Sequence, residues 1–357
     1  MNAYVGNALS LPFLDLPIVL APMGGASTVA LVAAVSNAGG FGILPCAYLT
    51  PEEITEQIGA LRAATQRPFG VNVFVENPPY VADTARVARA HNRLRPYREE
   101  LGIPHREHPA LPPDHYRKQL DALLEAVPAV FTFTFGIPDE RTLARFRAAG
   151  TFTMGTATTV DEARALAAAD VDGILAQGSE AGAHRGTFLR PVEESLIGTL
   201  ALVPQIVDAT GLPVFAAGGI GDGRGVAAVL ALGASAALIG TSFLLATESG
   251  ISSAYRKALR AERARNTVLT RAFSGRAARG IANRATTELQ DAGDIAPYPF
   301  QNAMTRDIRN AAAQQGEPEL LSLWAGQAAS LAKEAPAADI VVELMRQARA
   351  SVSAIRV

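Results

Sequence analysis

The stretch "LPVFAAGGIGDGRGVAAVLALGASAALIGTSFL", Leu212 to Leu244, contains two short apolar runs separated by one amphipathic run. The apolar runs have the length and composition of buried strands, and the run between them has helical spacing and closes on Gly233. A strand, a helix and a second strand in this order are typical of a parallel sheet covered by helices. The stretch therefore predicts one unit of a repeated β/α fold.

The same alternation extends through the chain up to about residue 260. Six further apolar runs with strand character begin at Ile18, Phe41, Phe69, Val130, Phe152 and Gly173, which makes eight in all. Eight strands, each followed by a helix, predict an α/β fold of the (β/α)8 TIM barrel type. We expect residues 1–247 to form this barrel and residues 248–357 to form a mostly helical C-terminal region that contributes to the substrate pocket.

A polar, proline-rich insertion of about residues 76–118 interrupts the repeat after the third strand. It is far longer than the usual connection between a strand and a helix. Because it begins at the carboxyl end of a barrel strand, where barrel enzymes build their sites, we expect it to be a lid or a wall of the substrate pocket.

Composition narrows the class of partner. The chain has 357 residues, 49% of them hydrophobic, and a formal net charge of −2, so neither nucleic acid nor an anionic membrane is an expected partner. Its one cysteine, Cys46, excludes an intramolecular disulfide and a thiolate metal cluster, and fits a reducing cytoplasm. The residues before the first strand show no basic segment ahead of an apolar core, so we expect no secretory signal. The charge-free stretch from Val226 to Thr247 divides into a helix and a strand, so we interpret it as core rather than as a membrane span.

Glycine-rich turns follow the last two strands. In such barrels the loops after strands seven and eight, with the N-terminus of a short helix, present backbone N–H groups to a phosphate. Gly218 and Gly219 allow close approach of the backbone, while Gly240 and Thr241 add donors. The alternative is that these glycines only close tight turns. We favour a phosphorylated ligand or cofactor.

The ends of other strands place polar or backbone groups at the same opening of the barrel, where the carboxyl ends of the strands meet and which we call the barrel mouth. "APMGG" brings Pro22, Met23 and Gly24 to the end of the first strand, where they could line a flat aromatic ligand. Asn72 and Gln177, at the ends of strands three and six, carry amides that can donate and accept hydrogen bonds. Several such groups converging on one mouth predict a binding site.

His184 lies in "AQGSEAGAHRG", Ala176 to Gly186, directly after the sixth strand. Its position over the barrel mouth suggests a catalytic group that accepts a proton or stabilises an anion. The remaining histidines, His91, His105, His108 and His115, all lie in the insertion. They form no helical ligand pair and have no clear third ligand, so we expect no metal site.

These motifs together resemble the nitronate monooxygenases, formerly called 2-nitropropane dioxygenases. The resemblance is carried by "PIVLAPMGG", "FGVNVF", "FTFGIP", "AQGSEAGAHRG", the opening stretch, "FSGRAARGIANR", "PYPFQNAMTR" and "LWAGQ". It implies a TIM barrel that binds one FMN without a covalent bond. It also implies oxidation of alkyl nitronates such as propionate 3-nitronate by O2 to a carbonyl compound and nitrite. Neutral nitroalkanes are further candidate substrates, and we hypothesise that the reaction passes through a flavosemiquinone.

The resemblance also implies roles for individual residues. The flavin ring and ribityl chain would contact Pro22, Met23, Gly24, Asn72 and Gln177. The phosphate would be surrounded by Gly182, Gly218, Gly219, Ile239, Gly240 and Thr241, and Leu238 would also contact the cofactor. His184 would be catalytic, and Tyr116, Tyr298 and Arg306 would contact the substrate, whereas Glu180 and Arg185 would orient the loop.

Four positions, in three segments of the chain, depart from the family pattern. Ala183 stands where a second glycine is common before the histidine, and Leu238 stands where a glutamine is common before the Gly-Thr pair. Only backbone contact with the cofactor can therefore be expected at Leu238. Asn302 and Arg306 stand where aromatic or lysine residues occur, which bears on substrate identity.

Two other functions fit the same residues. One is an FMN-dependent NAD(P)H:quinone or enoyl-thioester reductase, which would share the phosphate and "APM" motifs. The other is a flavin-free phosphate-binding barrel, either an isomerase or lyase or a binding protein. As partners we expect a small nitronate or nitroalkane and O2, with the chain acting as a monomer or homodimer.

Overall fold

Eight parallel strands close into a barrel in the computed structural model, which describes residues 11–76, 83–110, 115–290 and 292–355. The barrel strands are β1 Ile18–Leu20, β2 Phe41–Pro45, β3 Gly70–Phe74, β4 Val130–Thr134, β5 Phe152–Ala157, β6 Gly173–Gln177, β8 Val214–Ala217 and β9 Ala236–Ile239. Pairing of β9 with β1 closes the ring. The predicted (β/α)8 barrel is thus confirmed, with all eight expected strands present.

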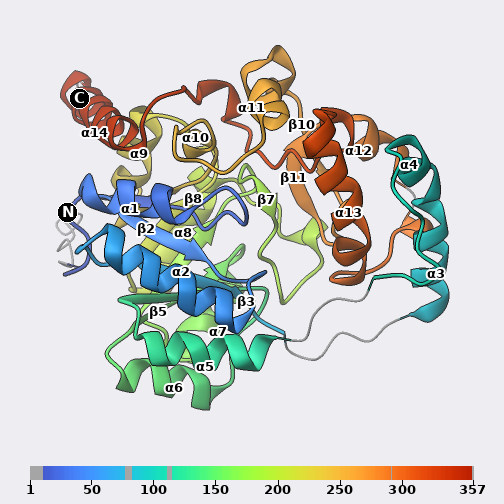
Figure 1. Ribbon diagram of the computed structural model, residues 1–357. Helices are drawn as coiled ribbons and strands as arrows, with labels where there is room; N and C mark the ends of the chain where they lie inside the picture. The colour runs from blue at the N-terminus through green and yellow to red at the C-terminus, as the bar shows by residue number, and fades with distance from the viewer. Residues whose placement is uncertain (1–10, 77–82, 111–114, 291, 356–357) are drawn as a thin grey trace.

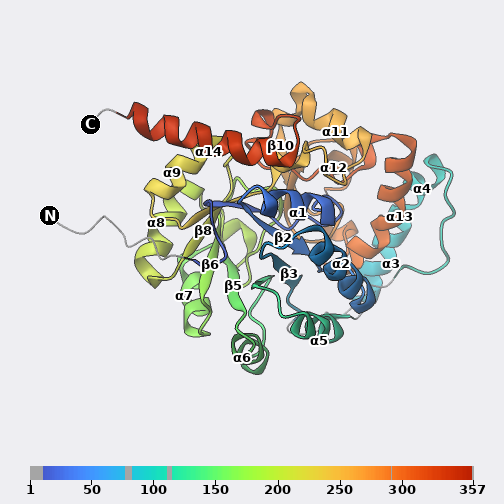
Figure 2. The same cartoon turned by 60° about the vertical axis from the view of Figure 1, so that its left-hand side comes forward.

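Helices surround the barrel (Figures 1 and 2). They are α1 Val29–Asn37, α2 Pro51–Ala64, α5 Tyr116–Ala126, α6 Glu140–Ala148, α7 Val160–Ala168, α8 Thr199–Thr210, α9 Gly223–Ala231 and the single turn α10 Thr241–Leu244. Their ends follow local chemistry, as α2 illustrates. Thr50 and Glu53 form a capping box around its first turn, and Pro51 occupies the first helical position.

Apolar side chains fill the amino-terminal half of the barrel. Phe13, which is 9% exposed, lies against Phe41 and Phe152 at ring-centroid distances of 5.0 and 5.2 Å. Both partners are the first residues of their strands, so Phe13 closes this end of the barrel. Any site must therefore lie at the opposite mouth, where the strands end.

The C-terminal region contains α11 Ser253–Arg260, α12 Arg284–Glu288, α13 Phe300–Gln315 and α14 Ala337–Ala354, with 3-10 turns η2 Glu262–Arg265, η3 Ala292–Asp294, η4 Pro318–Leu320 and η5 Ala329–Leu331. A further 3-10 turn, η1 Val192–Glu194, precedes α8. An antiparallel hairpin, β10 Thr267–Thr270 and β11 Ala278–Ile281, also lies in this region, and the sequence analysis did not predict it. β11 pairs in turn with β7, Ala183–His184. The loop that carries His184 is therefore an edge strand of a second small sheet.

The insertion packs on the C-terminal region in the part that the structure describes. Its helices α3 Thr84–Arg93 and α4 Arg95–Glu100 lie beside α13 (Figure 1). The guanidinium of Arg98, which is 1% exposed, bonds the Asp307 carboxylate at 2.9 Å and the Met304 carbonyl at 2.6 Å. Residues 77–82 and 111–114 of the expected lid lie outside the described residues.

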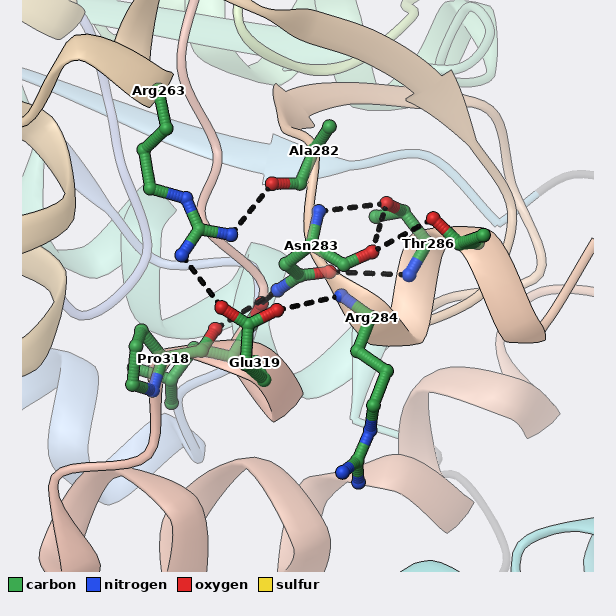
Figure 3. A network of polar contacts seen from close by, with 9 residues as sticks. Arg263, Ala282, Asn283, Arg284, Thr286, Pro318 and Glu319 are labelled. Atoms are coloured by element: carbon green, nitrogen blue, oxygen red, sulfur yellow. Dashed lines mark hydrogen bonds and ion pairs between the residues drawn. The ribbon is translucent and has the colours of Figure 1, made fainter.

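A polar network fixes the segment that leads to Trp324 (Figure 3). Asn283 caps α12 and donates from its amide to the carbonyls of Pro318 and Leu321. Glu319 accepts from the Arg263 side chain and from the backbone N–H of Arg284. The network ties η4 to the start of α12, so the chain that follows is held beside β11.

Among the described helices, none combines the length and the apolar character that crossing a bilayer would require.

Candidate active site at the barrel mouth

The loop after β6 is anchored by its own polar side chains. Gln177 donates from Nε2 to the His184 carbonyl at 2.9 Å and accepts at Oε1 from the Gly186 N–H at 2.8 Å. Arg185, which is 1% exposed, donates to the carbonyls of Gln177, Gly178 and Ser195. One N–H of the Gln177 amide remains for a ligand. These bonds support the expected structural role of Arg185.

The Glu180 carboxylate supports the same loop from its other side. It accepts from the Thr199 N–H at 3.0 Å and from the Thr199 hydroxyl at 2.9 Å, and so caps α8. This helix N-terminus is therefore already occupied by a carboxylate from the chain itself.

Aromatic rings surround the His184 imidazole. Its ring centroid lies 5.7 to 6.0 Å from those of Phe74, Phe135, Tyr298 and Trp324. The four rings come from the end of β3, the end of β4 and two separate C-terminal segments. Together they form an apolar wall that limits water around the imidazole.

The His184 imidazole is neutral at physiological pH. Burial first, and then the positive charges of Arg276 and Arg309, together lower the pKa of His184 from its ordinary value of 6.5 to about 3. The Arg276 guanidinium lies 3.8 Å from the Phe135 ring centroid, in a cation–π arrangement. The positive charge of the site is therefore carried by arginines rather than by the histidine.

Two phenols and a second arginine extend the site. The Tyr48 hydroxyl is hydrogen-bonded to Tyr298, and the Tyr48 side chain, 37% exposed, also contacts the Phe74 ring. Arg309, on α13, donates to the carbonyl and the side-chain oxygen of Asn302. Burial lowers the pKa of Arg309 to about 10, which leaves it cationic.

The ends of β8, β9 and β1 form the other half of the mouth. A Cβ placed on Gly240 would lie 3.3 Å from the Met23 sulfur, so the two strand ends are close together. Gly218 and Gly219 have φ angles of +113° and +70°, which favour glycine. Leu238 packs inside the barrel, consistent with its having only backbone available to a ligand. Asn72 is 3% exposed and donates to the Thr132 hydroxyl.

Unpaired backbone donors gather at this half of the mouth. The N–H groups of Gly218, Gly219 and Thr241 have no hydrogen-bond acceptor among the described residues. α9 is capped by Asp222 and α8 by Glu180, whereas α10 begins at Thr241 without a side-chain cap. A cluster of unused N–H groups beside an uncapped helix start fits a phosphate dianion. The residues present therefore fit a phosphorylated cofactor.

The C-terminal chain completes this cluster. The Gly326 N–H donates to the Thr241 hydroxyl at 3.0 Å. A Cβ on Gly182 would lie 2.6 Å from the Gly326 nitrogen, so this expected cofactor residue is in close contact with the C-terminal segment.

Two expected substrate residues, Tyr116 and Arg306, make no ring contact with His184 and do not act on its charge among the described residues, and their contact with a substrate stays a prediction. Tyr116 begins α5 and packs against the barrel core, with Asp139 and Glu76 as its charged neighbours. Arg306 is exposed on α13, and its charge acts on Tyr48 and Arg309. Arg309, one turn further along, is the arginine of this helix whose charge acts on His184. Tyr298 is the expected substrate residue that the structure brings into the ring cluster.

Sequence reasoning missed several residues of the site, namely Tyr48, Phe74, Phe135, Ser274, Arg276, Arg309 and Trp324. Phe74 and Phe135 end strands that the analysis had identified, so the strand-end rule could have found them. Phe135 has a φ of +81°, which is rare for a residue other than glycine. Among the described residues, no group of three or more His, Cys, Asp or Glu side chains is arranged to hold a metal ion.

Comparisons with known proteins show which family the chain is similar to. The family model described as nitronate monooxygenase matches residues 9–347. A probable nitronate monooxygenase from Staphylococcus aureus is 42% identical over 339 residues, which cover 94% of each chain. The nitroalkane oxidase structure from Streptomyces ansochromogenes is 40% identical, with a TM-score of 0.91 over 98% of this chain and 100% of its own. FabK from Thermotoga maritima is 27% identical, with a TM-score of 0.75 over 95% of this chain and 94% of its own.

The backbone of Ala183 gives a stability prediction. Its φ of +61° is left-handed, a conformation that costs a residue with a Cβ about 1 kcal/mol. Ala183→Gly should relieve this strain and leave the protein as stable as, or about 0.5 kcal/mol more stable than, the parent, since glycine also increases the entropy of the unfolded chain. Ala181→Gly, in the same loop without a positive φ, should lose about 0.5–1 kcal/mol. Urea unfolding measures the stability of both variants. An equal loss of stability in the two would contradict backbone strain at Ala183.

Proposed function

Because the chain belongs to the nitronate monooxygenase family, whose members are flavin-dependent oxidoreductases, we propose that it oxidises alkyl nitronates with O2 to a carbonyl compound and nitrite. Propionate 3-nitronate is the example we would test first, with neutral nitroalkanes as additional substrates. The observation that carries the proposal is a neutral histidine, His184, set beside two arginine guanidiniums and two phenols at the barrel mouth. This arrangement suits an anion that is already rich in electrons.

We further propose FMN as the cofactor. The unpaired N–H groups of Gly218, Gly219 and Thr241 would hold its phosphate, and the backbone from Pro22 to Gly24 would lie against its ring. When bound, the flavin supplies the redox chemistry by taking electrons from the substrate and passing them to O2. The protein supplies orientation and electrostatics.

The residues of the chain would bind and orient a nitronate as follows. Arg276 and Arg309 provide positive charge at a site of low dielectric constant, where attraction for the nitronate anion is strong. Tyr48 and Tyr298 are hydrogen-bonded to each other, which leaves one phenol proton of the pair to donate to a nitro oxygen. The aromatic wall around His184 limits access of water to the reacting carbon. A nitronate needs no strong base, because its α-carbon has already lost its proton.

A neutral nitroalkane needs one more step, for which His184 is available. The uncharged imidazole can accept the α-proton, and the electron pair of the broken C–H bond then moves onto the nitro group. The two arginines stabilise the negative charge as it develops. This step converts a nitroalkane into the nitronate that the same site oxidises.

His184→Asn separates oxidation of nitronates, which needs no base, from oxidation of neutral nitroalkanes, for which His184 is the proposed base. The variant should lose turnover of nitroethane by at least about 100-fold, since general base catalysis contributes 10²–10⁴-fold. Turnover of ethyl nitronate should persist in part. Oxygen uptake with each substrate measures the two rates. An equal loss with both substrates would contradict the division of roles.

The depressed pKa of His184 predicts an unusual pH profile. A base with a pKa of about 3 stays unprotonated as the pH falls through 6.5, so kcat/KM for nitroethane should stay level from pH 8 to 5.5. Arg309→Met removes one of the charges that lower the pKa of His184. The fall of kcat/KM at low pH should therefore begin at a higher pH in this variant. Arg306→Met, the exposed arginine on the same helix, is the matched control and should leave the pH of this fall unchanged. A tenfold fall per unit below pH 6.5 in the parent enzyme would refute the neutral base.

Phosphate recognition can be tested with the cofactor alone. Hydrogen bonds to a charged group contribute about 1.5–3 kcal/mol each, so apoprotein should bind FMN at least about 100-fold more tightly than riboflavin. Quenching of flavin fluorescence gives both dissociation constants. Equal affinities would show that the N–H cluster does not hold the phosphate.

The two alternative functions predict different behaviour. A reductase would bleach its flavin rapidly when mixed anaerobically with NADH or NADPH, and a flavin-free barrel would purify colourless and fail to take up FMN.

For the assembly and location of the enzyme we propose a monomer or homodimer in the cytoplasm, with which the single buried Cys46 is compatible.

A further inference from the structure

Ser274 is 1% exposed, and its side chain is in hydrogen-bond contact with the His184 imidazole. It begins the tight turn Ser274–Gly275–Arg276 between β10 and β11. Gly275 has a φ of +82°, and a Cβ there would lie 2.2 Å from the Ala296 carbonyl oxygen, so this turn requires glycine. The turn wraps the backbone of Arg276 around the Ser274 hydroxyl.

Three hydrogen bonds use the full capacity of this hydroxyl. Ser274 Oγ donates to the Arg276 carbonyl at 3.0 Å and accepts from the Arg276 N–H at 3.3 Å. It also lies 2.8 Å from Nε2 of His184. A hydroxyl has one proton and two acceptor positions. If that proton pointed at Nε2 of His184, the Ser274 hydroxyl oxygen and the Arg276 carbonyl oxygen would face each other at 3.0 Å with no hydrogen between them. The arrangement that satisfies all three contacts therefore directs the proton at the Arg276 carbonyl and places a hydrogen on Nε2 of His184, which donates it to Ser274.

The second sheet makes this geometry rigid. His184 pairs with Ala278 across β7 and β11, and the Arg185 N–H donates to the Ala277 carbonyl at 2.9 Å. The histidine and the serine thus sit on two strands joined in fixed register. Nδ1 of His184 has no hydrogen-bond partner among the described residues, so its lone pair is available at the barrel mouth.

Building on the proposed function, we propose that Ser274 is a positioning residue that holds His184 in the tautomer protonated at Nε2. In this tautomer Nδ1 takes the α-proton of a neutral nitroalkane. The C–H bond breaks, an Nδ1–H bond forms, and the electron pair moves onto the nitro group, so that nitroalkane and imidazole become nitronate and imidazolium. The Ser274 oxygen accepts from Nε2–H throughout, and it holds the imidazolium after the transfer.

Loss of the Ser274 hydroxyl should therefore lower turnover of neutral nitroalkanes far more than turnover of preformed nitronates. Without the acceptor at Oγ, the tautomer protonated at Nδ1 becomes populated, and its hydrogen blocks the position that must receive the proton. A preformed nitronate skips this proton transfer. The ratio of the two activities therefore reports on Ser274 separately from general damage to the fold.

The test compares Ser274→Ala with Ser36→Ala in the FMN-loaded enzyme. Ser36 is also fully buried, and its hydroxyl accepts from the Gly42 N–H at 3.1 Å, far from the mouth. Ser274→Ala should lower kcat/KM for nitroethane by at least about tenfold while changing kcat/KM for ethyl nitronate by less than about threefold. Ser36→Ala should leave the ratio unchanged. An unchanged ratio in Ser274→Ala would overturn the proposal.

A second readout does not depend on turnover. Nitrogen-15 NMR of histidine-labelled protein, with His184 assigned by comparison with His184→Asn, should show Nε2 protonated and Nδ1 unprotonated in the parent, and an averaged tautomer in Ser274→Ala. A parent protonated at Nδ1 would overturn the proposal even if nitronates are oxidised. Absence of oxygen uptake with every nitronate, together with the expected NMR tautomer, would instead reject the proposed function and leave the Ser274–His184 contact standing.

Discussion

The pairing of β7 with β11 is the constraint on which the active site depends. It takes a loop that leaves the barrel after β6 and makes it a strand of a second sheet, with His184 opposite Ala278. Gln177 and Arg185 anchor the same loop to the barrel side. A histidine on a free loop would sample many positions, whereas this one is held from two directions at once. The strain at Ala183, with a φ of +61°, is a local cost of that arrangement.

The fixed loop also determines how charge is distributed. His184 is enclosed by four aromatic rings and lies near two guanidiniums, so the charged form of the imidazole is disfavoured on both counts. The guanidiniums stay ionised and give the pocket its positive potential. An anion is attracted by the arginines. In the proposed reaction of a neutral nitroalkane, the nitronate charge that forms beside the imidazole offsets the repulsion between the guanidiniums and the imidazolium, which allows His184 to take the proton. One site can thereby accept both a nitronate and its neutral parent.

Much of this arrangement could be predicted from the sequence, because strand ends in a parallel barrel must converge. Met23, Asn72, Gln177, Gly218 and Gly240 lie at the expected mouth, and His184 stands over it. The hairpin that holds His184 could not be foreseen, since a segment rich in alanine and arginine has helical propensity, and its strands form only by pairing with a distant loop. Arg309 was not predicted, because recognising which arginines of one helix face inward requires knowledge of how the helix packs, and the substrate contact of Arg306 stays a prediction.

Oxidation of nitronates by O2 at the barrel mouth is the central property proposed for this enzyme. The most direct measurement is simultaneous recording of oxygen uptake and nitrite release by the FMN-loaded enzyme supplied with propionate 3-nitronate or ethyl nitronate. We predict oxygen uptake that depends on the nitronate and is accompanied by nitrite. No uptake with either nitronate, in an enzyme whose flavin is nonetheless rapidly reduced by NADH or NADPH, would contradict the account.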